Sequence, residues 1–175
     1  MENMKKIIVI GCPGSGKSHF SRELHKKTGI DLYHLDMMYW NSDKTTVEKE
    51  VFLERLNNVL EKERWIIDGN YISTMETRLS RCDTVIFLDY PTEISLEGVR
   101  QRRGKPRDDM PWVENDEDLE FIEYIKSFNA QQRPVVIELL EKNRLARRIL
   151  TFSSREEAEN FLQLYGSESA FCKQI

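Results

Sequence analysis

Residues 11–18 of the sequence, Gly-Cys-Pro-Gly-Ser-Gly-Lys-Ser, have the composition and spacing of a loop that binds phosphate groups. They match the pattern G-x-x-x-x-G-K-S/T, the Walker A motif. A loop whose backbone N–H groups all point at one polyphosphate needs glycine where a Cβ would block the approach or where φ must be positive. The motif therefore predicts a nucleoside triphosphate site. The alternative interpretation of these residues is a glycine-rich turn that binds no ligand.

The residues of this motif have separate expected roles. Lys17 reaches the β and γ phosphates and is a catalytic candidate, while the Ser18 hydroxyl is a ligand for Mg²⁺. A helix that starts at about Gly16 adds free N–H groups and the positive end of its dipole. The expected cofactors are ATP and Mg²⁺. The residues expected to bind the nucleotide here are Gly11, Pro13, Gly14, Ser15, Gly16, Lys17, Ser18 and His19.

Two aspartates follow segments with strand patterns. Residues 30–36 alternate apolar and polar side chains and end on Asp36, and a buried-type run ends on Asp68. Ligands of open α/β sheets lie outside the carboxyl ends of the strands, so both carboxylates are expected to face the phosphate loop. We expect Asp68 to hold Mg²⁺, directly or through water, and Asp36 to act on an acceptor. The alternatives are a turn residue for Asp68 and a helix N-cap for Asp36.

The residues after Asp36 bear on whether an acceptor pocket exists. Residues 37–40, Met-Met-Tyr-Trp, could line such a pocket or pack in the core. A cluster of Asp36, Tyr39, Trp40 and Arg78 would favour a kinase, because a nucleotide-dependent switch protein needs no acceptor pocket.

A basic cluster at residues 100–107 contains glycine and proline as well as arginine and lysine. It could be a solvated surface. Beside a triphosphate site, arginines on a mobile lid can instead neutralise the charge of the transferring phosphoryl group and exclude water. Arg100 and Arg103, three apart on one helical face, and Arg107 are the expected catalytic arginines.

The periodicity predicts an α/β fold whose five strands belong to one sheet. A capping-box pattern opens a helix at Thr45, and two further helices, residues 116–128 and 133–142, are expected to be separated near Pro134. The expected organisation is a single domain over residues 1–175.

The whole chain has 175 residues and a net charge of −4, which disfavours nucleic acid as the main partner. Its N-terminal apolar run is too short for a signal peptide, and no run approaches membrane-spanning length. We therefore expect a cytoplasmic protein, a monomer or a dimer, whose partners are a nucleoside triphosphate and a small-molecule acceptor.

Several blocks of the sequence resemble bacterial proteins labelled DNA topology modulation proteins, which are small relatives of adenylate kinase. The blocks are residues 8–18, 33–40, 65–71, 85–91 and 107–111. This resemblance implies a three-layer α/β phosphate-loop fold like that of the nucleoside-monophosphate kinases. Such a fold has a five-stranded parallel sheet, and the resemblance implies a lid at about 100–115 and an acceptor-binding insert at about 37–64. It also places Arg100 and Arg103 approximately at the lid arginines, and Ser154 and Arg155 where adenylate kinase closes its adenine pocket.

The sequence departs from adenylate kinase in the acceptor region. Adenylate kinase follows its Asp-Gly with Phe-Pro-Arg, whereas residues 70–72 here are Asn-Tyr-Ile, and no arginine stands soon after Asp36. An aspartate at the end of the second strand is similar to the small-metabolite kinases for shikimate and gluconate, where that carboxylate meets the acceptor hydroxyl. The leading expectation is an ATP-dependent kinase acting on a hydroxylated metabolite or a nucleoside monophosphate. A regulatory ATPase is the alternative, and a DNA-topology role comes third.

Overall fold

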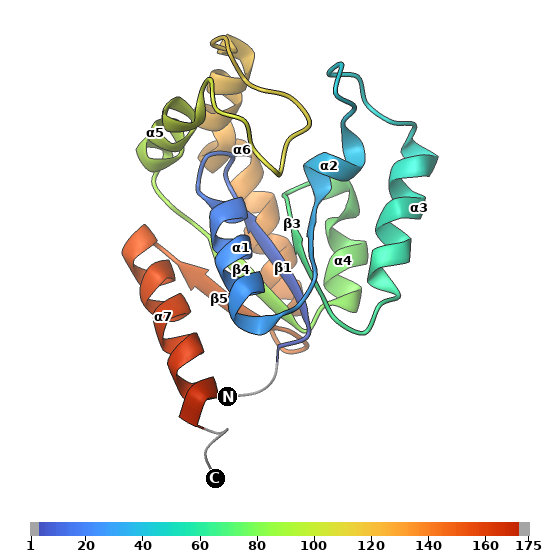
Figure 1. Cartoon of the computed structure of the whole chain (residues 1–175), viewed down its shortest axis with the longest axis vertical. Helices are drawn as coiled ribbons and strands as arrows, with labels where there is room; N and C mark the ends of the chain where they lie inside the picture. The colour runs from blue at the N-terminus through green and yellow to red at the C-terminus, as the bar shows by residue number, and fades with distance from the viewer. Residues whose placement is uncertain (1–3, 172–175) are drawn as a thin grey trace.

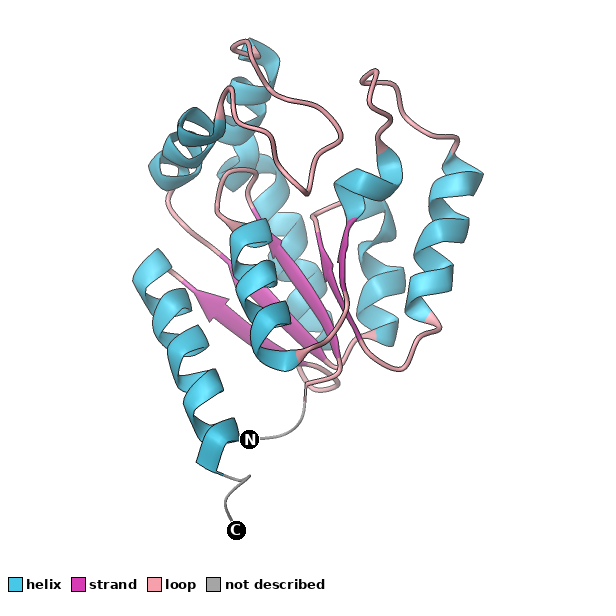
Figure 2. Cartoon of the chain, in the orientation of Figure 1, coloured by secondary structure: helices cyan, strands magenta, loops and turns pink. Residues whose placement is uncertain are grey.

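The computed structural model describes residues 4–171, which form a five-stranded parallel sheet with helices on both faces (Figure 2). The strands lie in the order β2-β3-β1-β4-β5. Their bounds are β1 Lys6–Gly11, β2 Leu32–His34, β3 Trp65–Asp68, β4 Thr84–Leu88 and β5 Arg148–Phe152. The prediction of a three-layer α/β phosphate-loop fold is confirmed.

Alternating side chains of the central strand separate the two cores. Ile8 and Ile10 pack toward α3, α4 and α6, whereas Ile7 and Val9 pack toward α1 and α7. A strand buried on both faces is continuously apolar, which explains the run of isoleucine and valine before the phosphate loop. The helices are α1 Lys17–Thr28, α2 Leu35–Tyr39, α3 Lys49–Leu60, α4 Met75–Arg81, α5 Thr92–Arg102, α6 Leu119–Asn143 and α7 Arg155–Phe171, with a 3-10 turn, η1, at Ile72–Thr74.

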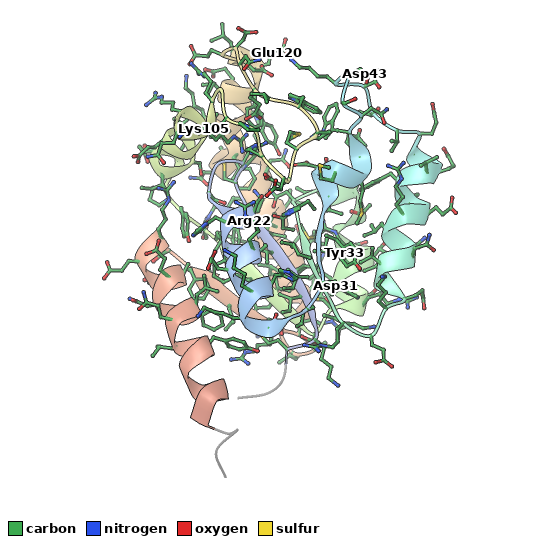
Figure 3. The ribbon with its side chains drawn as sticks, in the orientation of Figure 1. Arg22, Asp31, Tyr33, Asp43, Lys105 and Glu120 are labelled. Atoms are coloured by element: carbon green, nitrogen blue, oxygen red, sulfur yellow. The ribbon has the colours of Figure 1, made fainter. Side chains whose placement is uncertain are left out.

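The connections at the carboxyl ends of the strands gather on one side of the sheet. The segment between α5 and α6 passes over the phosphate loop toward α2 (Figure 1). Lys105 lies on that segment and Asp43 on the turn between α2 and α3, both at the same end of the molecule (Figure 3). Parallel strands deliver all these loops to one edge, so chain segments far apart in sequence meet there.

Two predicted boundaries around the second strand are wrong. The strand β2 ends at His34, and Asp36 lies in the first turn of α2 rather than at a strand end. The next helix begins at Lys49 and not at Thr45, because Thr45 bonds to Asp43 and Thr46 forms a bridge with Trp40. The residues of the apparent capping box are thus used to close a turn.

The two helices predicted around Pro134 are one continuous helix, α6, with Pro134 inside it. A proline in a helix interior costs roughly 3 kcal/mol. Apolar side chains on both sides of it, including Phe128 and Val136, are buried, and their packing outweighs that cost. Among the described residues, no helix is both long enough and apolar enough to span a membrane.

Candidate active site

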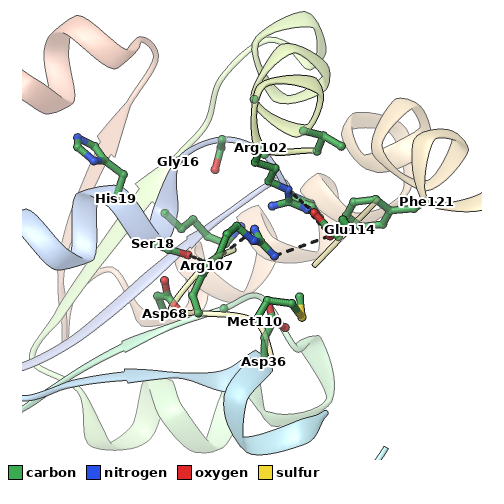
Figure 4. Close-up of a pocket in the computed structure, with 18 of the residues that line it drawn as sticks. Gly16, Ser18, His19, Asp36, Asp68, Arg102, Arg107, Met110, Glu114 and Phe121 are labelled. Atoms are coloured by element: carbon green, nitrogen blue, oxygen red, sulfur yellow. Dashed lines mark hydrogen bonds and ion pairs between the residues drawn. The ribbon is translucent and has the colours of Figure 1, made fainter. Parts of the chain in front are cut away.

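A cavity of about 1320 Å³ lies at the carboxyl end of the sheet. It brings together Lys17, Ser18, Asp36 and Asp68, which come from three different parts of the chain. Figure 4 shows Ser18, Asp36 and Asp68 in this cavity. The phosphate loop lines it from Pro13 to His19. The loop motif and the strand end at Asp68 predicted this convergence, whereas Asp36 reaches the cavity from the first turn of α2 and not from a strand end.

The phosphate loop is held in a conformation with several positive φ angles, among them 84° at Gly14 and 96° at Gly16. Gly11 does not line the cavity, and its N–H donates to Asn70 Oδ1 at 3.0 Å, which ties the loop to the end of β3. Lys17 Nζ donates to the carbonyl oxygen of Cys12 at 3.0 Å. Burial lowers the pKa of Lys17, and the charges of Asp68 and Asp36 partly oppose that shift.

Helix α5 packs its backbone directly on this loop. A Cβ on Gly14 would stand 2.1 Å from the carbonyl oxygen of Ser95, and one on Gly98 would stand 2.1 Å from the carbonyl oxygen of Gly14. Neither glycine can be replaced without moving backbone against backbone. The position of the phosphate loop is therefore coupled to the helix that leads into the basic segment.

Ser18 has a partner that sequence reasoning missed. Its Oγ donates to Asp109 Oδ2 at 2.6 Å, and Arg107 and Arg22 lie 3.7 and 3.9 Å from the Asp109 carboxylate. Burial alone would raise the pKa of Asp109. The hydrogen bond from Ser18 and the neighbouring charges of Arg107 and His34 lower this pKa by more than burial raises it, so the net shift is downward. The only sequence signal was the place of Asp109 in the block at residues 107–111.

Asp68 is buried at the end of β3, and one of its two carboxylate oxygens is hydrogen-bonded. His34 Nδ1 lies 2.9 Å from Asp68 Oδ1, whereas Asp68 Oδ2 has no hydrogen-bond partner among the described residues. An orphaned carboxylate oxygen facing a phosphate loop fits a hard cation such as Mg²⁺, which binds through one or two protein ligands and otherwise keeps water and phosphate oxygens. Within residues 4–171, no group of three or more His, Cys, Asp or Glu forms a complete metal cage.

Asp36 stands beside a constrained turn. Tyr71 donates its hydroxyl hydrogen to Asp36 Oδ1 at 2.7 Å, and Tyr71 itself has a φ of 28°. Burial raises the pKa of Asp36, and the bond from Tyr71 and the charge of Lys17 partly oppose the shift. Arg78 does not join this pocket as the sequence suggested. It is fully buried and donates to the carbonyl oxygens of residues 69, 70 and 71, so it holds the turn in place.

The basic segment brings a different set of arginines to the cavity from the predicted one. Arg103 and Arg107 line the cavity, and so does Arg102, which was not singled out. Arg100 is exposed and does not line it. The expectation that Arg100 and Arg103 share a helical face is wrong, because α5 ends at Arg102.

The two residues expected near the adenine ring have different surroundings. Arg155 lines the cavity and donates to the carbonyl oxygen of Ile94 at 3.2 Å. Ser154 does not line it, and its Oγ instead accepts from the N–H of Glu157 at 3.2 Å as the cap of α7. This end of the cavity is also lined by residues that sequence reasoning did not name, including Tyr90, Gly98, Ala158 and Leu162.

Solved structures of shikimate kinases are similar to this architecture. A shikimate kinase from Acinetobacter baumannii in complex with shikimate superposes with a TM-score of 0.60 and 19% identity, over 95% of this chain and 96% of that one. A shikimate kinase from Bacteroides thetaiotaomicron gives a TM-score of 0.54 and 20% identity, over 96% of this chain and 99% of that one.

No family model matches the sequence. The uncharacterized protein YqaC of Bacillus subtilis (strain 168) is 33% identical over 103 residues, and the match covers 56% of this chain and 56% of that protein. The chain is thus similar to about half the length of that relative. At identities of 19% and 20%, the solved structures establish the fold. The chain has the three-layer α/β phosphate-loop fold that these shikimate kinases share.

Proposed function

We propose that the protein is an ATP-dependent phosphotransferase that moves the γ-phosphoryl group of Mg-ATP to a hydroxyl group of a small acceptor. One observation carries the proposal: Lys17, Ser18, Asp68 and Asp36 line the same cavity. A phosphate loop alone would serve a regulatory ATPase equally well. Asp36, which accepts a hydrogen bond from Tyr71 in the same cavity, would have no use in such a regulator.

In this proposal, Lys17 and the N–H groups of the loop bind the β and γ phosphates. Ser18 Oγ and Asp68 Oδ2 are the protein atoms that would hold Mg²⁺, and the bound ion would neutralise charge on the phosphate oxygens. Asp36 orients the acceptor hydroxyl and accepts its proton. Its raised pKa makes it a stronger base than an ordinary aspartate.

The segment around residues 100–115 acts as a lid and residues 37–64 bind the acceptor, all within one domain. Arg102, Arg103 and Arg107 line the cavity from the lid side and would stabilise charge on the transferring phosphoryl group. The structural similarity to shikimate kinases and the sequence resemblance to relatives of adenylate kinase support a kinase function. A direct action on DNA has no support from a chain with a net charge of −4.

The test is an incubation of the protein with γ-radiolabelled ATP, Mg²⁺ and a bacterial small-molecule extract, followed by chromatography. We expect a labelled product other than inorganic phosphate, formed by the wild type and not by Lys17→Ala. Label that appears only in inorganic phosphate, at the same rate with and without extract, would contradict the proposal and favour a regulatory ATPase.

A further inference from the structure

The end of the cavity beyond the phosphate loop is built from aromatic side chains, which we call the aromatic end: Tyr39, Trp40, Tyr71 and Trp112. Tyr39 contacts Trp40 and Tyr71 edge-to-face, with ring centroids 5.2 and 5.1 Å apart. Trp40 contacts Trp112 of the lid segment at 5.3 Å, also edge-to-face. Phe52 also packs against Tyr39 and Tyr71, with ring centroids 5.3 and 5.4 Å apart, so parts of these two tyrosine rings are covered. None of the ring contacts within the aromatic end is a face-to-face stack.

Asp36 is the charged group bound into the aromatic end, since Tyr71 donates to Asp36 Oδ1 at 2.7 Å. A carboxylate there can accept a hydrogen bond from an acceptor hydroxyl. It repels an anionic acceptor, and with burial around it this repulsion is screened less than it would be in water.

The arginines of residues 100–107 that line the cavity each stand near a carboxylate. Arg102 donates to Glu114 Oε1 at 3.0 Å, and Arg107 lies 3.7 Å from Glu114. Arg103 donates to Glu117 Oε1 at 2.8 Å. A bound phosphate or carboxylate on the acceptor would compete with Glu114 and Glu117 for Arg102 and Arg103, which are already hydrogen-bonded to these carboxylates.

Lys44 also lines the cavity, from the turn between α2 and α3. Its side chain is exposed, and among the described ion pairs it takes part in none. A flexible, solvated ammonium group offers a weak and screened contact rather than a fixed anion site.

From this arrangement we propose that the acceptor is an uncharged compound that carries the reacting hydroxyl on a ring with an apolar face, of the sugar or nucleoside class, and not a carboxylic acid or a nucleoside monophosphate. The proposal rests on the kinase function proposed above. The ring lies against the aromatic end while its hydroxyl meets Asp36. Trp112 contributes from the lid, so the lid takes part in binding the acceptor as well as in covering the phosphates.

The first test separates a bacterial small-molecule extract on an anion-exchange resin. The unretained fraction, passed through a cation-exchange resin to remove cations, and the retained, anionic fraction are each incubated with the protein, Mg²⁺ and γ-radiolabelled ATP. We expect labelled product from the unretained fraction. Product from the retained fraction alone would overturn the acceptor class while leaving the kinase function standing, and product from neither would overturn both.

The second test compares matched pairs that differ in charge, such as a nucleoside with its monophosphate and a phenyl glucoside with the phenyl glucuronide. ADP release above the basal rate is measured for each compound. For every pair that reacts, we expect the uncharged member to have a kcat/KM about 10-fold higher or more, since an anion would remain unpaired beside Asp36. A preference for the anionic members would overturn the proposal.

Two variants locate the acceptor within the cavity, with the best uncharged acceptor as substrate. Trp112→Ala should raise the KM for that acceptor about 5- to 20-fold, more than it changes the KM for Mg-ATP. Lys44→Ala is the contrasting variant: Lys44 also lines the cavity, and its loss should change the KM for an uncharged acceptor less than Trp112→Ala does. A large effect of Lys44→Ala together with none of Trp112→Ala would mean that the acceptor is held by charge and would overturn the proposal.

Discussion

The pair of His34 and Asp68 makes one charge of the candidate site depend on pH. Burial lowers the pKa of His34, whereas the hydrogen bond and the charge of Asp68 raise it, and the net shift is upward. Asp109 also raises this pKa and Arg22 lowers it. A histidine whose folded pKa exceeds its unfolded value, about 6.5, adds stability that is fully present below that value. The added stability is lost as pH rises through the folded pKa.

We therefore expect His34→Gln to lower the melting temperature more at pH about 5.5 than at pH about 9, on either side of the unfolded histidine pKa. Differential scanning calorimetry of both proteins at the two pH values measures this. An equal loss at both values would mean that the His34–Asp68 contact contributes no proton-linked stability.

Single residues could be predicted where their position follows from a motif or an element end. Lys17 and Ser18 follow from the loop motif, and Asp68 follows from the end of a buried strand. Asp109 could not be found this way. Its contact with Ser18 depends on how an irregular segment folds back over the loop, and no hydrophobic period encodes such a path.

At the scale of elements, the contact between α5 and the phosphate loop gives a direct prediction. Alanine in place of glycine within a helix normally stabilises it by roughly 0.5–1 kcal/mol. We expect the opposite for Gly98→Ala, because its Cβ would stand 2.1 Å from the carbonyl oxygen of Gly14. The variant should lower the melting temperature and reduce the further rise that Mg-ATP produces.

Glu97→Ala, at the exposed neighbouring position of α5, is the matched control for this measurement. If Gly98→Ala and Glu97→Ala respond alike to Mg-ATP, the packing of α5 does not set the geometry of the loop.

The lid segment provides a second prediction at this scale. Charge on the transferring group is larger in the transition state than in the ground state, so the lid arginines should act on rate more than on nucleotide affinity. We expect Arg107→Ala to lower kcat by about 10²- to 10⁵-fold, the range of arginines that act on a transferring phosphoryl group. Steady-state kinetics with Mg-ATP measures the effect.

Arg100→Ala is the comparison variant, since Arg100 is exposed and lies outside the cavity lining. A loss of rate as large in Arg100→Ala as in Arg107→Ala would show that the exposed face, and not the cavity face, of this segment matters.

At the scale of the whole molecule, the sheet and its class were predictable because apolar periodicity identifies parallel strands buried on both faces. The predicted boundaries of helices and strands were wrong where tertiary contacts outweighed local sequence signals. Pro134 reads as a helix break, yet α6 continues through it because its buried side chains pack on both sides. The contact between Trp40 and Trp112 could not be predicted from the sequence either, since it joins segments 72 residues apart that no motif links.

In the proposed function, the two ends of one cavity have separate tasks, with the triphosphate at Lys17 and the acceptor at Asp36. The most direct measurement compares wild type, Lys17→Ala and Asp36→Asn in two readouts on the same samples. These are the rise in melting temperature with Mg-ATP and the rate of phosphoryl transfer to an acceptor.

Lys17→Ala should lose most of the melting-temperature rise and the transfer together, because it removes contacts to the phosphates. Asp36→Asn should keep the rise and lose transfer by about 10²- to 10⁴-fold, the range for a positioned base. Transfer that survives Asp36→Asn, or an equal rise in Lys17→Ala and wild type, would contradict this division of the site.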